Sequence, residues 1–319
     1  MNEKIANLVG FVEKNSLDYL ILHKSGKVHS VHNKGFYFFW GNELYLVHGL
    51  KYGTIPYGIA INENVNFKEI CLEKYMMVYC SNLNLFVPES GLVIKLKNAN
   101  NPRRDTYEWK QNVSSSLMVE LNINSVSEYA LSKSSSNNVL DLLFKNLEAL
   151  FNTRKKEKHS LNKFCEYCFN YLFLLVNSII RNKLDMTKDA LSHLIGLGTG
   201  LTPLMDDVIL GMFSSLFYLR KYYPDELFFV STLGRILYFE SKGKTTLISE
   251  MYLQHASKGE RFKIFDETTY IIMYSTDDSL LQDKIDLILS IGSNSGKGML
   301  LGIIIGIKIL LKLSSKSVN

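Results

Sequence analysis

The chain has 319 residues, of which 46% are hydrophobic and 21% are charged, a composition that excludes a largely disordered protein. The net charge is only +5, from 36 basic and 31 acidic residues, and no dense basic block appears. We therefore expect no nucleic-acid partner, and the length favours two domains.

Residues 17–100 contain short segments rich in β-branched and aromatic side chains, and Gly, Asn, Ser or Pro separates many of them. Regularly spaced segments of this kind predict a small antiparallel barrel or sandwich. Residues 2–14 allow a short helix. The predicted strands cover residues 17–23, 27–33, 34–40, 42–49, 57–62, 74–80 and 91–97.

Residues 98–116 lack these regularly spaced β-branched and aromatic segments and are mostly polar. From residue 139 onward, apolar residues recur at spacings of three and four, which predicts helices. We expect an α+β protein with a β-rich, barrel-like domain over residues 1–110, a linker and connecting segment over 111–138, and an all-helical domain over 139–319. The predicted helices cover residues 139–152, 160–183, 188–196, 201–223, 226–243, 245–259, 279–292 and 295–313.

Cys165 and Cys168 form one Cys-x-x-Cys pair, with no second pair or nearby histidine to complete a zinc site. This predicts buried free thiols, no metal and no cofactor. The longest apolar run, residues 299–311, is broken by Lys308 and is shorter than the ~20 residues of a typical membrane span. We expect a buried helix and no membrane partner, and the absence of a secretory signal pattern predicts a cytoplasmic protein.

The segment GLGTGLTPLMDDVILG, residues 196–211, does not resemble ordinary core sequence. Gly196, Gly198 and Gly200 fall at every second position and permit a tight turn. Thr202 suits a helix N-cap and Pro203 the first helical position, so a helix is predicted to begin at Thr202. The N–H groups of a helix start that face such a turn form a ready anion site.

Asp206 and Asp207 follow directly in the same segment. They either complement the helix dipole or take part in chemistry. Adjacent helical residues diverge by about 100°, so the two carboxylates are expected to point to different partners.

Residues 245–259, TTLISEMYLQHASKG, place hydroxyl groups at another predicted helix start. Thr245 and Thr246 are suitable caps, and Ser249 lies one turn after Thr246 on the same face. Thr246 and Ser249 either reach one ligand together or serve only the helix.

Residues 292–298, GSNSGKG, form a second glycine-rich turn before a helix. Ser295 and Gly296 are candidates to hold an anion, and Lys297 to add charge. Gly298, Gly302 and Gly306 recur every four residues, which predicts close packing of this helix against another.

Taken together, these three segments resemble the AllH-like family, the H subunit of the oxamate carbamoyltransferase of anaerobic allantoin breakdown. The family pattern is roughly GLGPGLTPSGDD, then TTxxSxxxLxxAxxGxF, then GHxSGxDxLxG. The segment KSGKVHSVHNKGFYFFWGNELYLVH is similar to the family's early β region. The chain departs from the pattern at Thr199 for proline, Leu204 and Met205 for Ser-Gly, Ser293 for histidine and Gly298 for aspartate.

The resemblance implies a subunit that works with sister transferase subunits on small anionic substrates, converting oxalurate and phosphate to oxamate and carbamoyl phosphate. Asp206 and Asp207 are then the catalytic candidates. Because of the departures, a diverged, non-catalytic module that binds a small anion or carboxylate remains the alternative, and a helical scaffold is a third reading. The ligand-binding candidates are Gly196, Gly198, Gly200, Thr202, Thr246, Ser249, Ser295 and Gly296.

Overall fold

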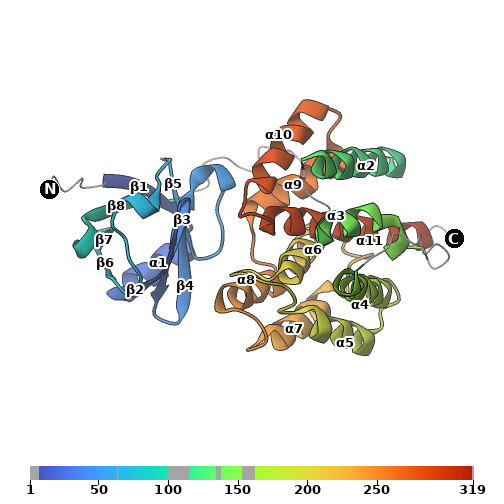
Figure 1. The fold of residues 1–319 in the computed structure, drawn as a ribbon, viewed down its shortest axis with the longest axis horizontal. Coiled ribbons are helices and arrows are strands. Elements are labelled where there is room, and N and C mark those ends of the chain that lie inside the picture. Colours follow the sequence, from blue (N-terminus) through green and yellow to red (C-terminus); the bar gives the residue numbers. More distant parts are fainter. Residues whose placement is uncertain (1–6, 63, 100–114, 134–137, 153–161, 318–319) are drawn as a thin grey trace. The chain divides into compact units, whose positions relative to one another are not determined.

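The computed structural model describes residues 7–62, 64–99, 115–133, 138–152 and 162–317. The chain divides into two compact units, one formed by Met1–Glu108 with Phe262–Ile264 and the other by Trp109–Arg261 with Phe265–Asn319. The first unit is built around a β-barrel and the second from helices (Figure 1), which confirms the predicted α+β class.

Eight strands close the barrel in the order β1-β5-β4-β3-β2-β6-β7-β8. Most neighbours are antiparallel, as expected, but β1 pairs with β8 and β4 with β5 in parallel. The strands are β1 Asn7–Val12, β2 Ser25–His32, β3 Gly35–Trp40, β4 Glu43–Gly49, β5 Gly58–Ile61, β6 Met77–Ser81, β7 Asn84–Val87 and β8 Leu92–Asn98.

Two predictions near the start of the barrel are wrong. Residues 7–12 form strand β1 instead of part of a helix, because alternate side chains such as Leu8 and Val12 enter the barrel core. Residues 17–22 belong to helix α1 (Lys14–Leu22) instead of a strand, because Leu17 and Leu20 bury one helical face. The short strand β7 was not predicted.

The helical unit contains helices in all parts that the structure describes, and no strand is found there. Two helices lie outside the predicted set: α2, within the expected connecting segment, and α9. The buried face of α2 is formed by Val119, Ile123, Val126 and Ala130, and intervening serines and asparagines obscure that spacing in the sequence. The helices are α2 Ser116–Ser132, α3 Val139–Lys145, α4 Lys163–Ile180, α5 Leu184–Leu194, α6 Leu204–Arg220, α7 Val230–Ser241, α8 Leu247–Ser257, α9 Lys263–Tyr274, α10 Asp278–Leu289 and α11 Ser295–Ser317.

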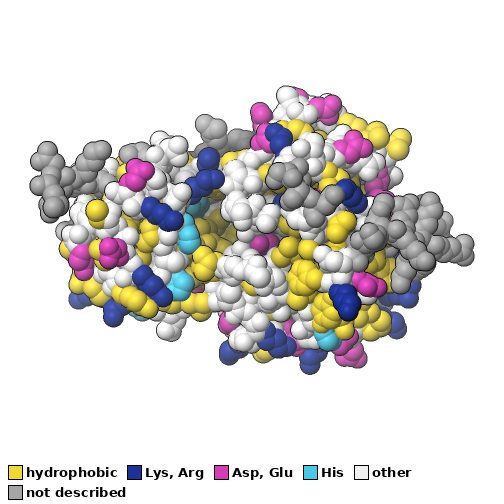
Figure 2. Space-filling view, in the orientation of Figure 1, with side chains coloured by type: hydrophobic (Ala, Val, Ile, Leu, Met, Phe, Trp, Pro, Cys, Tyr) yellow, Lys and Arg dark blue, Asp and Glu magenta, His cyan; other side chains and the backbone are white. Residues whose placement is uncertain are grey.

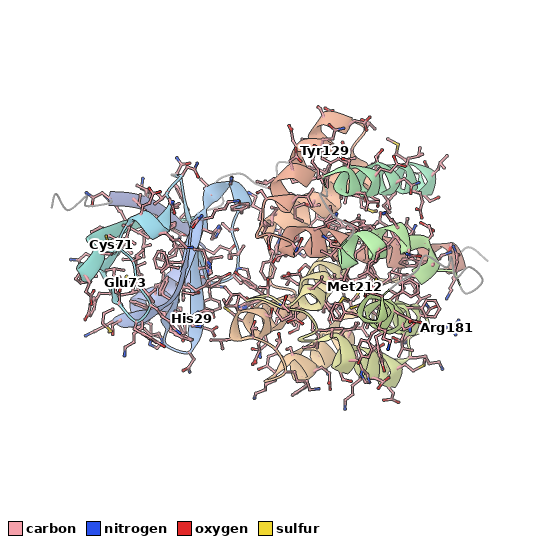
Figure 3. The ribbon with its side chains drawn as sticks, in the orientation of Figure 1. His29, Cys71, Glu73, Tyr129, Arg181 and Met212 are labelled. Atoms are coloured by element: carbon pink, nitrogen blue, oxygen red, sulfur yellow. The ribbon has the colours of Figure 1, made fainter. Side chains whose placement is uncertain are left out.

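Helix α11 packs closely along α6 in the helical unit (Figure 1). A Cβ atom on Gly302 would lie 2.0 Å from the Val208 carbonyl oxygen of α6, so the two backbones approach as closely as the glycine repeat predicts. The interface also contacts Met212, which Figure 3 places inside this unit.

Helix α11 is longer than the apolar run seen in the sequence, and the stretch Ser295–Lys316 has the length and hydropathy of a membrane span. However, 72% of its apolar 18-residue stretch is buried inside the protein. This degree of burial is typical of a core helix, the role we expected for it.

Candidate functional site

Helix α6 begins at Leu204, with Pro203 in the N-cap position, so the prediction that it begins at Thr202 is wrong. The Thr202 hydroxyl does not cap the first turn of α6. It donates to Asp207 Oδ2 over 3.2 Å and lies 2.8 Å from the Ser295 hydroxyl. Thr202 therefore joins the start of α6 to the start of α11.

The turn before α6 needs its glycines for backbone reasons. Gly196, Gly198 and Gly200 have φ angles of +79°, +132° and +101°, a region that other residues rarely adopt. A Cβ on Gly198 would lie 2.4 Å from the Leu204 nitrogen. Among the described residues, no acceptor is found for the backbone N–H groups of residues 198–202, so these donors remain available to a ligand.

Asp206 is buried and binds the turn to the start of α8. Its Oδ1 accepts the Gly196 N–H over 2.7 Å, and its Oδ2 accepts the Thr245 hydroxyl. Burial raises the pKa of Asp206, while hydrogen bonds from Thr245, Gly196 and Ser249 oppose that rise. With both oxygens engaged by the protein, Asp206 acts as a clamp between two segments.

Asp207 lies beside it but faces other partners, as the helical divergence predicts. Its side chain is buried and hydrogen-bonds to the Thr202 and Ser295 hydroxyls. Burial raises the pKa of Asp207 to about 8, against the opposing effect of those two hydrogen bonds. Burial therefore favours the protonated form of Asp207 near neutral pH, and two hydroxyl groups contact its carboxyl.

The hydroxyl groups at the start of α8 are engaged within the protein. Thr246 is the N-cap: it accepts the Ser249 N–H and donates to the Leu201 carbonyl oxygen over 2.5 Å. Ser249 is buried beside Asp206. These bonds hold α8 against the glycine turn, and direct ligand contact by Thr246 and Ser249 stays a prediction.

The second glycine-rich turn leads into α11, which begins at Ser295. In the described part of the chain, the N–H groups of residues 292–295 have no acceptor and resemble those of the first turn in this respect. Gly296 is buried, and a Cβ there would lie 1.9 Å from the Ile288 carbonyl oxygen. Close packing against α10 therefore accounts for Gly296, and ligand binding by it stays a prediction.

Lys297 does not point its charge at the turn, contrary to expectation. Its side chain is buried and its Nζ forms an ion pair with Asp141 of α3. Asp141 also belongs to a capping box with Asn138 at the start of α3. The Asn-x-x-Asp spacing signals that cap in the sequence, but no local pattern indicates the contact with Lys297, which lies 156 residues away.

The structure thus joins all three motifs. Thr202 meets Ser295, 93 residues away, and Asp206 meets Thr245, 39 residues away. The assembled set contains two turns with unpaired N–H groups, a pair of linked hydroxyls and a buried carboxyl whose pKa is raised. Such a set suits the binding of a small anion and the transfer of a proton.

Other kinds of site gain less support from the described residues. No group of three or more His, Cys, Asp or Glu side chains there could hold a metal ion. Cys165 and Cys168 are buried free thiols on α4, and burial raises the pKa of both. On the face shown in Figure 2, lysine and arginine side chains lie as separate spots.

Comparison with known families agrees with this convergence of motifs. The family model described as oxamate carbamoyltransferase subunit AllH matches residues 194–307, which contain all three motifs. The model of the AllH family N-terminal domain matches residues 6–101, the barrel region. No curated protein and no solved structure matches the chain. The two matches together cover most of the chain, which therefore belongs to the AllH family.

Proposed function

We propose that this chain is a subunit of a carbamoyltransferase complex that converts oxalurate and phosphate to oxamate and carbamoyl phosphate. The main support for this proposal is that the two glycine-rich turns meet around Asp207, where the Thr202 and Ser295 hydroxyls lie 2.8 Å apart. The family description supports the reaction class and the membership of a complex with sister subunits.

The two turns are the proposed site for the anionic reactants. Unpaired N–H groups of residues 198–202 and 292–295 lie just before the starts of α6 and α11. Helix starts of this kind stabilise phosphate and carboxylate groups, because several N–H dipoles point at the bound anion. The same donors would stabilise negative charge that develops on the carbamoyl oxygen.

Asp207 is the proposed general acid. Phosphate attacks the carbamoyl carbon of oxalurate, the bond from that carbon to the oxamate nitrogen breaks, and Asp207 supplies the proton that the nitrogen needs. The proton lost by the attacking phosphate then returns to the Asp207 carboxylate. A pKa of about 8 keeps this carboxyl protonated at neutral pH, as the acid role requires.

The anion site can be tested by calorimetry on the full-length chain. We expect inorganic phosphate and oxamate to bind the wild type, and Ser295→Ala and Thr202→Val each to weaken phosphate affinity about tenfold, through loss of one hydroxyl each. Asp283→Asn, on the exposed side of α10, is the matched control and should bind like the wild type. Unchanged affinity in both site variants would contradict the proposal.

A second candidate is a non-catalytic module that binds the same anions. Two positions where the related pattern has polar side chains favour it: Ser293 stands for histidine, and Gly298 leaves no side chain beside the Asp207 Cβ. Product formation separates the candidates. If the chain and its sister subunits form product and Asp207→Asn abolishes this turnover, the transferase is supported. If the chain binds phosphate but Asp207→Asn leaves turnover unchanged, the non-catalytic module is supported.

A further inference from the structure

Helix α11 presents two contrasting faces to its neighbours in the helical unit. Toward α6 it presents Gly298, Gly302 and Gly306, whose absent side chains allow close contact. A row of glycines supplies no side chain that interlocks with the partner helix along the common axis. The glycine contacts and the buried apolar side chains of α11 both resist sliding, and charged groups on the other faces of the helix add to them.

Two buried lysines lie on another face of the same helix. Lys297 and Lys308 are 7% and 3% exposed, respectively. They are 11 residues apart, which places them within about 20° of each other around the helix and about 16 Å apart along it. Buried lysines are rare and need anionic partners.

Both lysines have such partners in the segments that pack against this face. Lys297 pairs with Asp141 of α3, and Lys308 pairs with Glu120 of α2 at 2.7 Å and Glu148 at 2.8 Å. Displacing α11 by one helical turn, about 5.4 Å, would leave both ammonium groups buried without these carboxylates. Buried ion pairs add little net stability. The main effect expected of these two pairs is therefore to fix the position of α11 along the segments that pack against it.

The Lys297 pair lies next to the candidate site. Ser295 is two residues before Lys297, and its hydroxyl meets Thr202 at 2.8 Å. Gly298, one residue after Lys297, is so close to Asp207 that a Cβ there would lie 3.0 Å from the Asp207 Cβ. A shift of α11 by about one ångström would separate the Ser295 and Thr202 hydroxyls.

We propose that the Lys297–Asp141 ion pair is a positioning device that fixes the start of α11, so that Ser295 and its turn meet Thr202 and Asp207. This inference rests on the proposed function only for its consequence in ligand binding. Lys297 acts through Ser295 and makes no contact with the reactants. Lys308, at the far end of the same face, fixes α11 against α2 and residues 147–150.

The test compares Lys297→Met with Lys308→Met in the full-length chain. Each substitution removes a buried ammonium group from α11, so both should lower the melting temperature. Amide hydrogen exchange is then followed by mass spectrometry in peptides spanning residues 194–210 and 290–300, and phosphate affinity by calorimetry. We expect Lys297→Met to raise exchange in both peptides at least tenfold and to weaken phosphate binding at least fivefold.

The matched Lys308→Met variant should leave both readouts within twofold of the wild type. Asp141→Asn removes the partner charge without changing α11 and should reproduce the Lys297→Met pattern, which keeps the test valid should Lys297→Met not fold. Equal exchange in the Lys297→Met and Lys308→Met variants, or wild-type exchange in both Lys297→Met and Asp141→Asn, would overturn the inference. A wild type that binds no phosphate would contradict the proposed function alone, because hydrogen exchange still reports the position of α11.

Discussion

The two units of the chain bury different kinds of side chain. The barrel core consists of large aromatic and aliphatic groups such as Phe36, Phe38 and Trp40, and among the barrel's described residues Ser16 and His48 are the only buried polar side chains besides its aromatic ones. The helical unit buries carboxylates and lysines, including Asp207 and Lys297. Burying ionisable groups is costly unless they are paired or hydrogen-bonded, so these positions of the helical unit add less to stability than the apolar core of the barrel.

The largest expected effect lies in the barrel. Phe36→Ala empties a fully buried position that contacts Phe38 and Phe67, and should lower the free energy of unfolding by about 3–5 kcal/mol. Chemical denaturation at pH 5 and pH 8 should show the same loss at both values, because no titrating group is involved. Phe39→Ala, on the exposed side of the same strand, is the control, and an equal loss there would remove the distinction between core and surface.

The helical unit should instead show stability that depends on pH. The pKa of Asp207 rises from 3.8 to about 8 on folding, so the native state binds the proton more tightly than the unfolded chain between those values. The free energy of unfolding should therefore fall as pH rises from about 4 to about 8, by a few kcal/mol, and Asp206 adds to the fall because its pKa is also raised. Denaturation at several pH values should show a flatter profile in Asp207→Asn than in Asp283→Asn, and equally steep profiles would count against a protonated Asp207.

A smaller effect is expected at the clamp between the glycine turn and α8. Thr245→Val removes one of the hydrogen bonds to Asp206 and should lower the free energy of unfolding by about 1 kcal/mol. Hydrogen exchange at Gly196, whose N–H also binds Asp206, should rise in this variant. Thr232→Val, at an exposed position of α7, serves as the control. If Gly196 exchange responds equally to both substitutions, Asp206 does not act as a clamp.

Much of the fold follows from local patterns. β-Branched and aromatic enrichment in segments such as residues 35–40 and three–four spacing in segments such as 163–180 identified most strands and helices. The segment 17–22 was misassigned because its apolar residues fit a strand as well as a helix, and length alone does not separate them. Closure of the barrel through the parallel pair β1–β8 depends on contacts over more than 80 residues, which no local pattern encodes.

The candidate site was only partly predictable for the same reason. The glycine turns and the divergence of Asp206 from Asp207 follow from helix geometry and backbone preference. The role of Thr202 could not be predicted in this way. Its hydroxyl hydrogen-bonds to Ser295, which is 93 residues away in the sequence, instead of capping α6. The charge of Lys297 was likewise assigned to the turn, whereas tertiary packing directs it to Asp141.

The central claim is that Asp207, held by Thr202 and Ser295, supplies a proton for carbamoyl transfer. The most direct measurement is the turnover of the complex, assembled with its sister subunits, as a function of pH. Wild-type turnover should fall above about pH 8 as Asp207 ionises, and Asp207→Asn should be at least about 100-fold slower without that decline. An Asp207→Asn complex with the wild-type rate and the wild-type pH profile would contradict the claim.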